Sequence, residues 1–207
     1  MAAQLTSTTE RSLLATVEEA HERALGALDS GEVLDAVVWL SAHLAAVHRV
    51  IQPALRRIPG ESAARQRQRM LDLQLERLLR IAERRFSGDA QAAELSSDNL
   101  ERGLRTALTD HAHAEHSLVA HLESVLSAEE LAVLSSAYAA ALQHAPTRPH
   151  PHAPHFGLLG MAAFRIDAWR DKLLDTMDSR HVPAPRVERH PSAPGRWARY
   201  LLGQMER

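Results

Sequence analysis

The chain has 207 residues, with 24 lysines and arginines, 26 aspartates and glutamates, 13 histidines and no cysteine. Because its formal net charge is only -2, the overall balance gives no reason to expect a nucleic-acid or anionic-membrane partner. The lack of cysteine excludes disulfides, thiolate nucleophiles and iron–sulfur clusters. Any metal site therefore has to use histidine and carboxylate ligands.

The composition predicts an all-α protein with one sizeable domain. Alanine and leucine dominate, β-branched residues are sparse and aromatic residues make up 4% of the chain, which favours helices over strands. The first residues lack the pattern of a signal peptide, and no run of about 18 apolar residues occurs. We therefore expect a soluble, cytoplasmic protein without a membrane partner.

The first two predicted helices each place a histidine among apolar residues. The first begins near Thr8 or Thr9 and ends at a polar and glycine stop at residues 29–31, with His21 central to its apolar stripe. The second covers about residues 32–57 and carries His43 at the edge of its stripe. Pro53 inside this second helix predicts a kink.

Three further helices complete a predicted bundle of four long helices and a shorter fifth. The third, residues 62–86, directs arginines interleaved with acids toward solvent, which favours a salt-bridged face over a nucleic-acid surface. The fourth covers about residues 97–126, and Ser127 opens a capping box for a fifth that ends near His144. The apolar face expected for the third helix consists of Leu71, Leu75, Leu78, Leu79 and Ala82.

The remaining chain divides into a connector, a docking helix and a tail. Residues 146–155 hold four prolines and three histidines, and we expect this stiff connector to pack across the bundle rather than bind metal. An amphipathic helix over about residues 157–178 should dock on the bundle. We expect a helical domain at residues 8–145, a connector and docking helix at 146–180, and a poorly ordered tail at 181–207. The connector's histidines are His150, His152 and His155.

The most informative motif lies in the fourth helix, where two ionisable residues interrupt a leucine stripe. His111 and Glu115 are one helical turn apart and share one face with Leu104, Leu108, Leu118, Leu122 and Val125. Burying such a pair is costly unless each member finds a partner, which metal ligation or a hydrogen-bond network would supply.

Helical wheels of the other helices add companions to this pair. Facing helices of a bundle build metal sites from inward histidines and carboxylates, and the candidate ligands are His21, His43, His111 and Glu115. Three imidazoles and one carboxylate suit iron, manganese or zinc. The alternative is a histidine cluster that only satisfies its own hydrogen bonds.

The other histidines of the helices are poorer candidates. His48 follows His43 by five residues, so on an α-helix the two point about 140° apart and His48 should border a different interface. His113 and His116 project away from the stripe of their own helix, and His121 lies at its margin. A solvated face is the expected place for these three.

An inward His21, His43 on the second helix and the His111-x-x-x-Glu115 motif on the fourth together resemble the hemerythrin-like, or HHE cation-binding, family. The resemblance covers about residues 10–145, and the segment after residue 146 is similar to an extension of actinobacterial members. It implies a four-helix up-down bundle with a non-haem di-iron centre. It further implies oxygen binding, or a response to oxygen, redox state or metal, with O2 or peroxide as ligands.

The chain departs from the family pattern at two of six ligand positions. Val47 stands where the second-helix glutamate is expected, and the third helix contains no histidine. Either the four matching residues hold a single ion, or one of Asp72, Gln74, Glu76 and His48 substitutes, or the fold persists as a scaffold or interaction module without metal. An oxidase or peroxide-consuming enzyme is a further reading. We favour a reduced site, or none, over an intact di-iron centre.

Overall fold

The computed structural model describes residues 12–89, 92, 94 and 96–145, and every regular element in these ranges is helical. The elements are α1 (Leu13–Asp29), α2 (Val33–Ala46), the π-helix η1 (Val47–Ile51), α3 (Gln52–Leu55), α4 (Ser62–Phe86), α6 (Ser97–Val125) and α7 (Ala128–Gln143). The predicted all-α class is confirmed for this part of the chain. The predicted connector, docking helix and tail lie outside the described residues.

Local sequence signals set the helix ends. The predicted cap of the first helix at Thr8 or Thr9 is wrong, because the side chain of Ser12 accepts the backbone N–H of Ala15 and α1 begins at Leu13. The capping box predicted at Ser127 is confirmed: the Ser127 side chain accepts the backbone N–H of Glu130, and the Glu130 side chain accepts the backbone N–H of Ser127. Gly31 follows α1 with a φ of 75°, a left-handed conformation that favours glycine.

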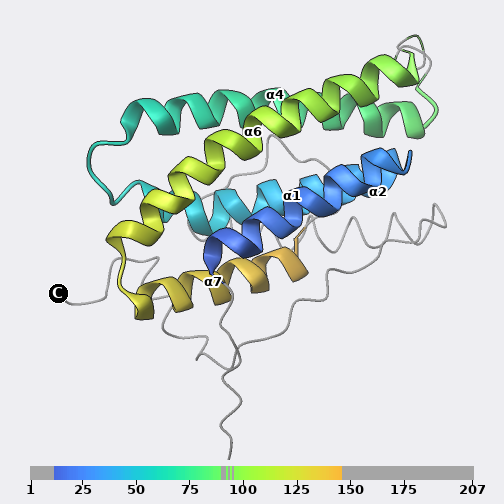
Figure 1. Ribbon diagram of the computed structural model, residues 1–207. Helices are drawn as coiled ribbons and strands as arrows, with labels where there is room; N and C mark the ends of the chain where they lie inside the picture. Colours follow the sequence, from blue (N-terminus) through green and yellow to red (C-terminus); the bar gives the residue numbers. More distant parts are fainter. Residues whose placement is uncertain (1–11, 90–91, 93, 95, 146–207) are drawn as a thin grey trace, which may run out of the picture.

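Four helices pack in a closed ring. α1 contacts α2 and α6, while α4 contacts the same two helices from the other side. In Figure 1, α4 and α6 lie side by side above α1 and α2, and α7 lies beneath α1. α7 contacts α1, α2 and η1, so it caps one end of the ring as an additional helix.

The apolar core consists of two clusters with a polar layer between them. On α6, Leu104 and Leu108 belong to one cluster, and Leu118 and Leu122 belong to the other. Burial of each leucine contributes about 1.5–3 kcal/mol, so the two clusters can support the cost of a polar layer at His111 and Glu115. Val125, the last residue of the predicted α6 stripe, is 49% exposed, so its predicted burial is wrong.

The buried face of α4 differs from the predicted one. Leu75, Leu79 and Ala82 are buried as expected, but Leu71 and Leu78 are only partly buried. Instead the face continues toward the start of the helix through Gln68 and Asp72, each 1% exposed. These residues share the 3.6-residue period of the leucines, and α4 therefore brings polar groups to the core.

A π-helical turn stands where the kink at Pro53 is predicted. A proline lacks the N–H of a regular helix, and its ring collides with the carbonyl four residues earlier. The wide turn of η1 ends directly before this site, with the N–H of Gln52 donating to the carbonyl of Val47. Such turns are frequent at functional sites, and η1 carries His48.

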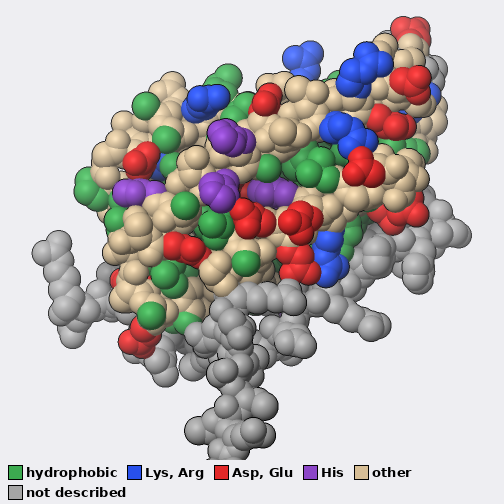
Figure 2. All heavy atoms as spheres, viewed as in Figure 1, with side chains coloured by type: hydrophobic (Ala, Val, Ile, Leu, Met, Phe, Trp, Pro, Cys, Tyr) green, Lys and Arg blue, Asp and Glu red, His purple; other side chains and the backbone are tan. Residues whose placement is uncertain are grey.

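The surface of the described residues mixes charges of both signs. On the face shown in Figure 2, basic and acidic side chains are interspersed. On α4, Arg84 pairs with Asp89 at 2.6 Å, and Arg65 donates to the carbonyls of Leu55 and Ile58. Of these two arginines, Arg84 forms a salt bridge and Arg65 contacts backbone carbonyls.

One described stretch, Val33–Leu55, is long and apolar enough by length and composition to cross a membrane. Of its most apolar window, 67% is buried inside the protein. A core helix passes the same test, so the stretch is only weak evidence for a membrane span.

Candidate metal centre

Three helices bring the four predicted ligands to one point inside the ring. α1 supplies His21, α2 supplies His43, and α6 supplies both His111 and Glu115. Their exposed fractions are 5%, 0%, 0% and 1%, respectively. His43, predicted at the edge of the α2 stripe, is therefore fully buried.

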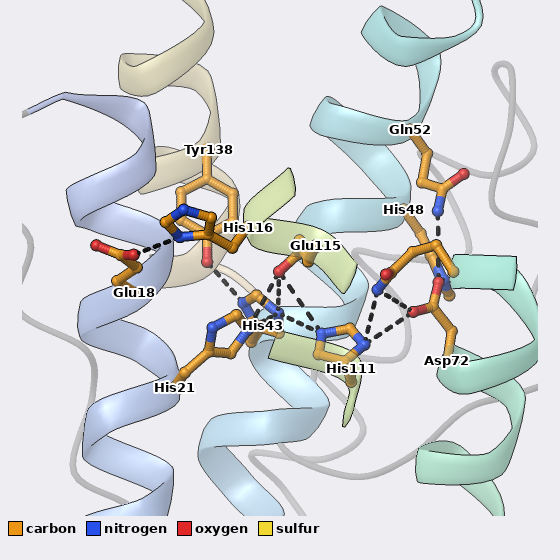
Figure 3. A network of polar contacts seen from close by, with 11 residues as sticks. Glu18, His21, His43, His48, Gln52, Asp72, His111, Glu115, His116 and Tyr138 are labelled. Atoms are coloured by element: carbon orange, nitrogen blue, oxygen red, sulfur yellow. Dashed lines mark hydrogen bonds and ion pairs between the residues drawn. The ribbon is translucent and has the colours of Figure 1, made fainter. Parts of the chain in front are cut away.

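The ligating atoms converge closely. His43 Nε2 lies 3.0 Å from His21 Nε2, 3.1 Å from His111 Nε2 and 3.0 Å from Glu115 Oε2. Glu115 Oε2 also lies 3.1 Å from His21 Nε2 and 3.6 Å from His111 Nε2. All four atoms are within 4.8 Å of one another, and Figure 3 shows the side chains meeting below Glu115.

Pairwise hydrogen bonds do not account for these contacts. An imidazole nitrogen has either one hydrogen or one lone pair, so His43 Nε2 can form only one well-directed hydrogen bond, yet it has three close neighbours. Both carboxylate oxygens of Glu115 are buried without a well-aligned hydrogen-bond donor. Hydrogen bonds among the four side chains therefore do not explain why their ligating atoms lie so close together.

The same distances suit ligands of a common ion. Two donors about 2.1 Å from one ion lie about 3.0 Å apart at a right angle and about 3.4 Å apart at a tetrahedral angle. Four of the five distances above are 3.0–3.1 Å, and the fifth is 3.6 Å. These four residues could therefore hold a metal ion.

The imidazole rings of His111 and His43 each have a second contact at Nδ1, the nitrogen that faces away from the convergent point. His111 Nδ1 lies 2.9 Å from Asp72 Oδ1, and His43 Nδ1 lies 2.8 Å from the Tyr138 hydroxyl. Metal-binding histidines are commonly oriented by such a bond to the ring nitrogen that faces away from the ion. α4 and α7 thus support the site although neither supplies one of the four ligating atoms.

The electrostatics of the group are dominated by burial and by its carboxylates. Burial lowers the pKa of His43 to about 4, a shift that Glu115 only partly opposes. Burial also acts to lower the pKa of His111, but Glu115 and Asp72 overcome it and raise the value to about 10. Burial acts to raise the pKa of Glu115, yet His43 and His111 hold it well below its usual value.

Two buried carboxylates lie in this layer. Asp72 and Glu115 are each 1% exposed and ionised, whereas His111 supplies one positive charge and His43 is neutral. A divalent cation bound by neutral imidazoles would neutralise both carboxylates. Two buried carboxylates therefore favour a cation at this site, which can replace the His111 proton.

The other sequence candidates lie outside the convergent group. Gln74 is exposed, and Val47 belongs to the apolar core. His48 Nε2 instead lies 3.0 Å from Asp72 Oδ2, so His48 faces α4 and lies outside the convergent group, as predicted from its spacing to His43. The expected solvated face is found for His113 and His116, which are exposed, while His121 is partly buried.

Sequence reasoning missed three supporting residues or their roles. Asp72, one of the possible substitute ligands, contacts His111 and does not lie at the convergent point. Gln68 donates to Asp72 at 2.9 Å, and its spacing to Asp72, Leu75 and Leu79 was the available signal. No motif marked Tyr138, which reaches the site only through the packing of α7.

We expect Tyr138→Phe to lower the free energy of unfolding of the metal-free protein by about 1–3 kcal/mol, because His43 Nδ1 would remain buried without a partner. Urea denaturation in the presence of a chelator measures the change. A substitution without effect would show that the hydroxyl does not support His43.

Comparison with protein-family models, curated proteins and solved structures found no match for this chain. The function of the chain is therefore inferred from its own residues and their geometry.

Proposed function

We propose that this chain is a hemerythrin-like metal-binding protein with a reduced site that holds a single non-haem iron ion. The observation that carries the proposal is the contact of His43 Nε2 with three potential ligating atoms at 3.0–3.1 Å. The order of the ligands supports it as well, with one histidine on each of the first two helices and the His111-x-x-x-Glu115 pair on α6. The ring of α1, α2, α4 and α6 is compatible with an up-down bundle of that family.

A single ion agrees with what surrounds the four residues. Val47 is buried among apolar side chains, and α4 carries no histidine. Both oxygens of Asp72 contact histidines, His111 on one side and His48 on the other. Among the described residues, one group of at least three histidine and acidic side chains has the proximity needed to hold an ion.

The roles of the residues follow from their burial. His21, His43 and His111 would each supply an imidazole nitrogen, and Glu115 would supply the charge that compensates the cation. Apolar layers on both sides exclude bulk water from the site. When bound, iron supplies a redox-active centre with coordination positions for a small ligand such as O2 or peroxide, which suits a response to oxygen, redox state or metal.

Metal analysis tests the proposal. Protein purified without metal-affinity steps, stripped with a chelator and supplied with Fe(II) under anaerobic conditions should retain about one ion per chain after desalting. Mn(II) and Zn(II) are supplied in separate samples, because zinc generally binds such donors more tightly than Fe(II) in competition. Less than about 0.2 ion per chain with each of the three metals would overturn metal binding by this site.

A scaffold or interaction module is the second candidate. It is favoured by the position of His111, which lies between the carboxylates of Asp72 and Glu115 and can neutralise part of their charge without any ion. On this reading, His111→Ala changes the stability of the protein, while the metal content of wild type and variant stays equally low.

A further inference from the structure

Asp72 connects the candidate metal centre to the outer part of the helix ring. Its Oδ1 lies 2.9 Å from His111 Nδ1 and accepts a hydrogen bond from the Gln68 amide at 2.9 Å. Its Oδ2 faces the opposite way, 3.0 Å from His48 Nε2 and 3.4 Å from Gln52 Nε2. The two oxygens of one carboxylate thus serve an inner and an outer histidine.

The three side chains differ sharply in their access to solvent. The side chain of His111 is 0% exposed and that of Asp72 is 1% exposed, whereas that of His48 is 15% exposed. Figure 3 shows the row running from His111 through Asp72 to His48 and Gln52, away from His21 and Tyr138. A partly exposed residue on η1 is therefore linked to a fully buried candidate ligand on α6.

We propose that Asp72 and His48 are positioning residues that make His111 a competent metal ligand. Asp72 holds the His111 ring so that Nε2 faces the ion, and His48 holds Asp72 in the orientation this requires. The inference rests on the proposed metal-binding function. It gives α4 an indirect role in the site, because the Asp72 carboxylate contacts His111 and not the ion.

The physical reason lies in the tautomer of His111. A neutral imidazole carries one hydrogen, which can reside on Nδ1 or on Nε2. The Gln68 amide nitrogen also lies 2.9 Å from His111 Nδ1, but it donates to Asp72 Oδ1 at the same distance. With the hydrogen of His111 on Nδ1 it is donated to Asp72, and the lone pair of Nε2 is free for the ion. Without this acceptor, the hydrogen can reside on Nε2, 3.1 Å from His43 Nε2, where it would compete with the ion.

His48 acts on the other oxygen. Asp72 can rotate about its side-chain bonds, and its carboxylate presents Oδ1 to His111 only in part of that range. The contacts of Oδ2 with His48 and Gln52 restrict this rotation. Because η1 directly follows α2, the residue that restrains Asp72 belongs to the same continuous helical stretch as His43.

Substitution of Asp72 tests the first half of the proposal. Asp72→Asn should weaken binding of Co(II), measured by competition with a chromophoric chelator, by about 10–100-fold. Glu83→Gln is the matched control, since it removes the same charge from the same helix three turns further on, and it should bind Co(II) like the wild type. The visible Co(II) spectrum of Asp72→Asn should keep its band positions, because the four ligands stay unchanged.

The outcomes separate the two proposals. A wild-type protein that binds none of Co(II), Fe(II), Mn(II) and Zn(II) overturns the metal-binding function itself. A wild type that binds Co(II) with an equally tight Asp72→Asn variant overturns the positioning role alone. A shift of the Co(II) bands in Asp72→Asn would also overturn it, because such a shift indicates a direct ligand.

Two variants of His48 test the second half and do not depend on folding of the Asp72 variant. His48→Ala should weaken Co(II) binding by about 3–10-fold, which is less than the 10–100-fold typical of a group that contacts a ligand directly. His48→Gln should restore most of the affinity, because its amide N–H can donate to Oδ2 from about the place of Nε2. Equal affinities of the wild type and His48→Ala would overturn the role of His48.

Discussion

The Glu115→Gln protein is expected to fold and to lose its metal. The substitution keeps the size of the side chain but removes the one carboxylate among the four convergent residues. A neutral amide oxygen is a much weaker ligand, and the amide N–H2 can turn toward the imidazole nitrogens at 3.0–3.6 Å. We expect affinity to fall by more than the 10–100-fold that is typical of an outer partner.

The measurement is metal content after anaerobic loading with Fe(II), together with far-UV circular dichroism as a test of helical fold. Asp110→Asn serves as the control, since Asp110 is an exposed acidic residue on the same helix. It should retain as much metal as the wild type. Equal metal content in Glu115→Gln and in the wild type would show that any bound ion lies elsewhere.

The helices and the convergence of four residues could be predicted because both depend on periodicity. His21, His111 and Glu115 lie on apolar stripes at steps of three and four, so their inward direction follows from the helical period alone. Ser127 likewise marks a helix start by local chemistry, because it forms a capping box with Glu130. Periodicity on separate helices cannot give distances between them, so the approach of His43 Nε2 to its three neighbours required the packed structure.

The supporting residues could not be predicted because tertiary packing decides their role. Its apolar side chain predicts Leu71 on the inner face of α4. Packing against α2 and α6 instead places Gln68 and Asp72 on that face. The π-helical turn of η1 has no reliable local signal beyond Pro53. Tyr138 reaches His43 across 95 residues of sequence, which no short-range pattern describes.

His111→Ala is expected to be among the most destabilising single substitutions in the metal-free protein. It removes the imidazolium between Asp72 and Glu115, whose oxygens lie 2.9 Å and 3.6 Å from its ring nitrogens. Removal of one partner from a buried charged group typically costs about 3–5 kcal/mol, because the remaining charges are uncompensated. Exposed His113 on the same helix is the control, and His113→Ala should change stability by less than about 0.5 kcal/mol.

The pH dependence of this difference identifies its origin. In the metal-free wild type, the pKa of His111 is raised from 6.5 to about 10, so its contribution is complete below pH 6.5 and is lost as pH rises toward 10. The lowered pKa values of Asp72 and Glu115 add stability above their unfolded values, and this is lost as pH falls through the folded ones.

In His111→Ala both carboxylates lose a positive partner, so burial raises their pKa values and the folded variant takes up protons as pH falls. The stability difference between wild type and variant should therefore be largest near pH 6.5 and should shrink toward both pH 5 and pH 9. Urea unfolding at these three pH values, with chelator present, measures it. A difference independent of pH would mean that the variant loses only packing at His111, and that the carboxylates of Asp72 and Glu115 do not depend on its charge.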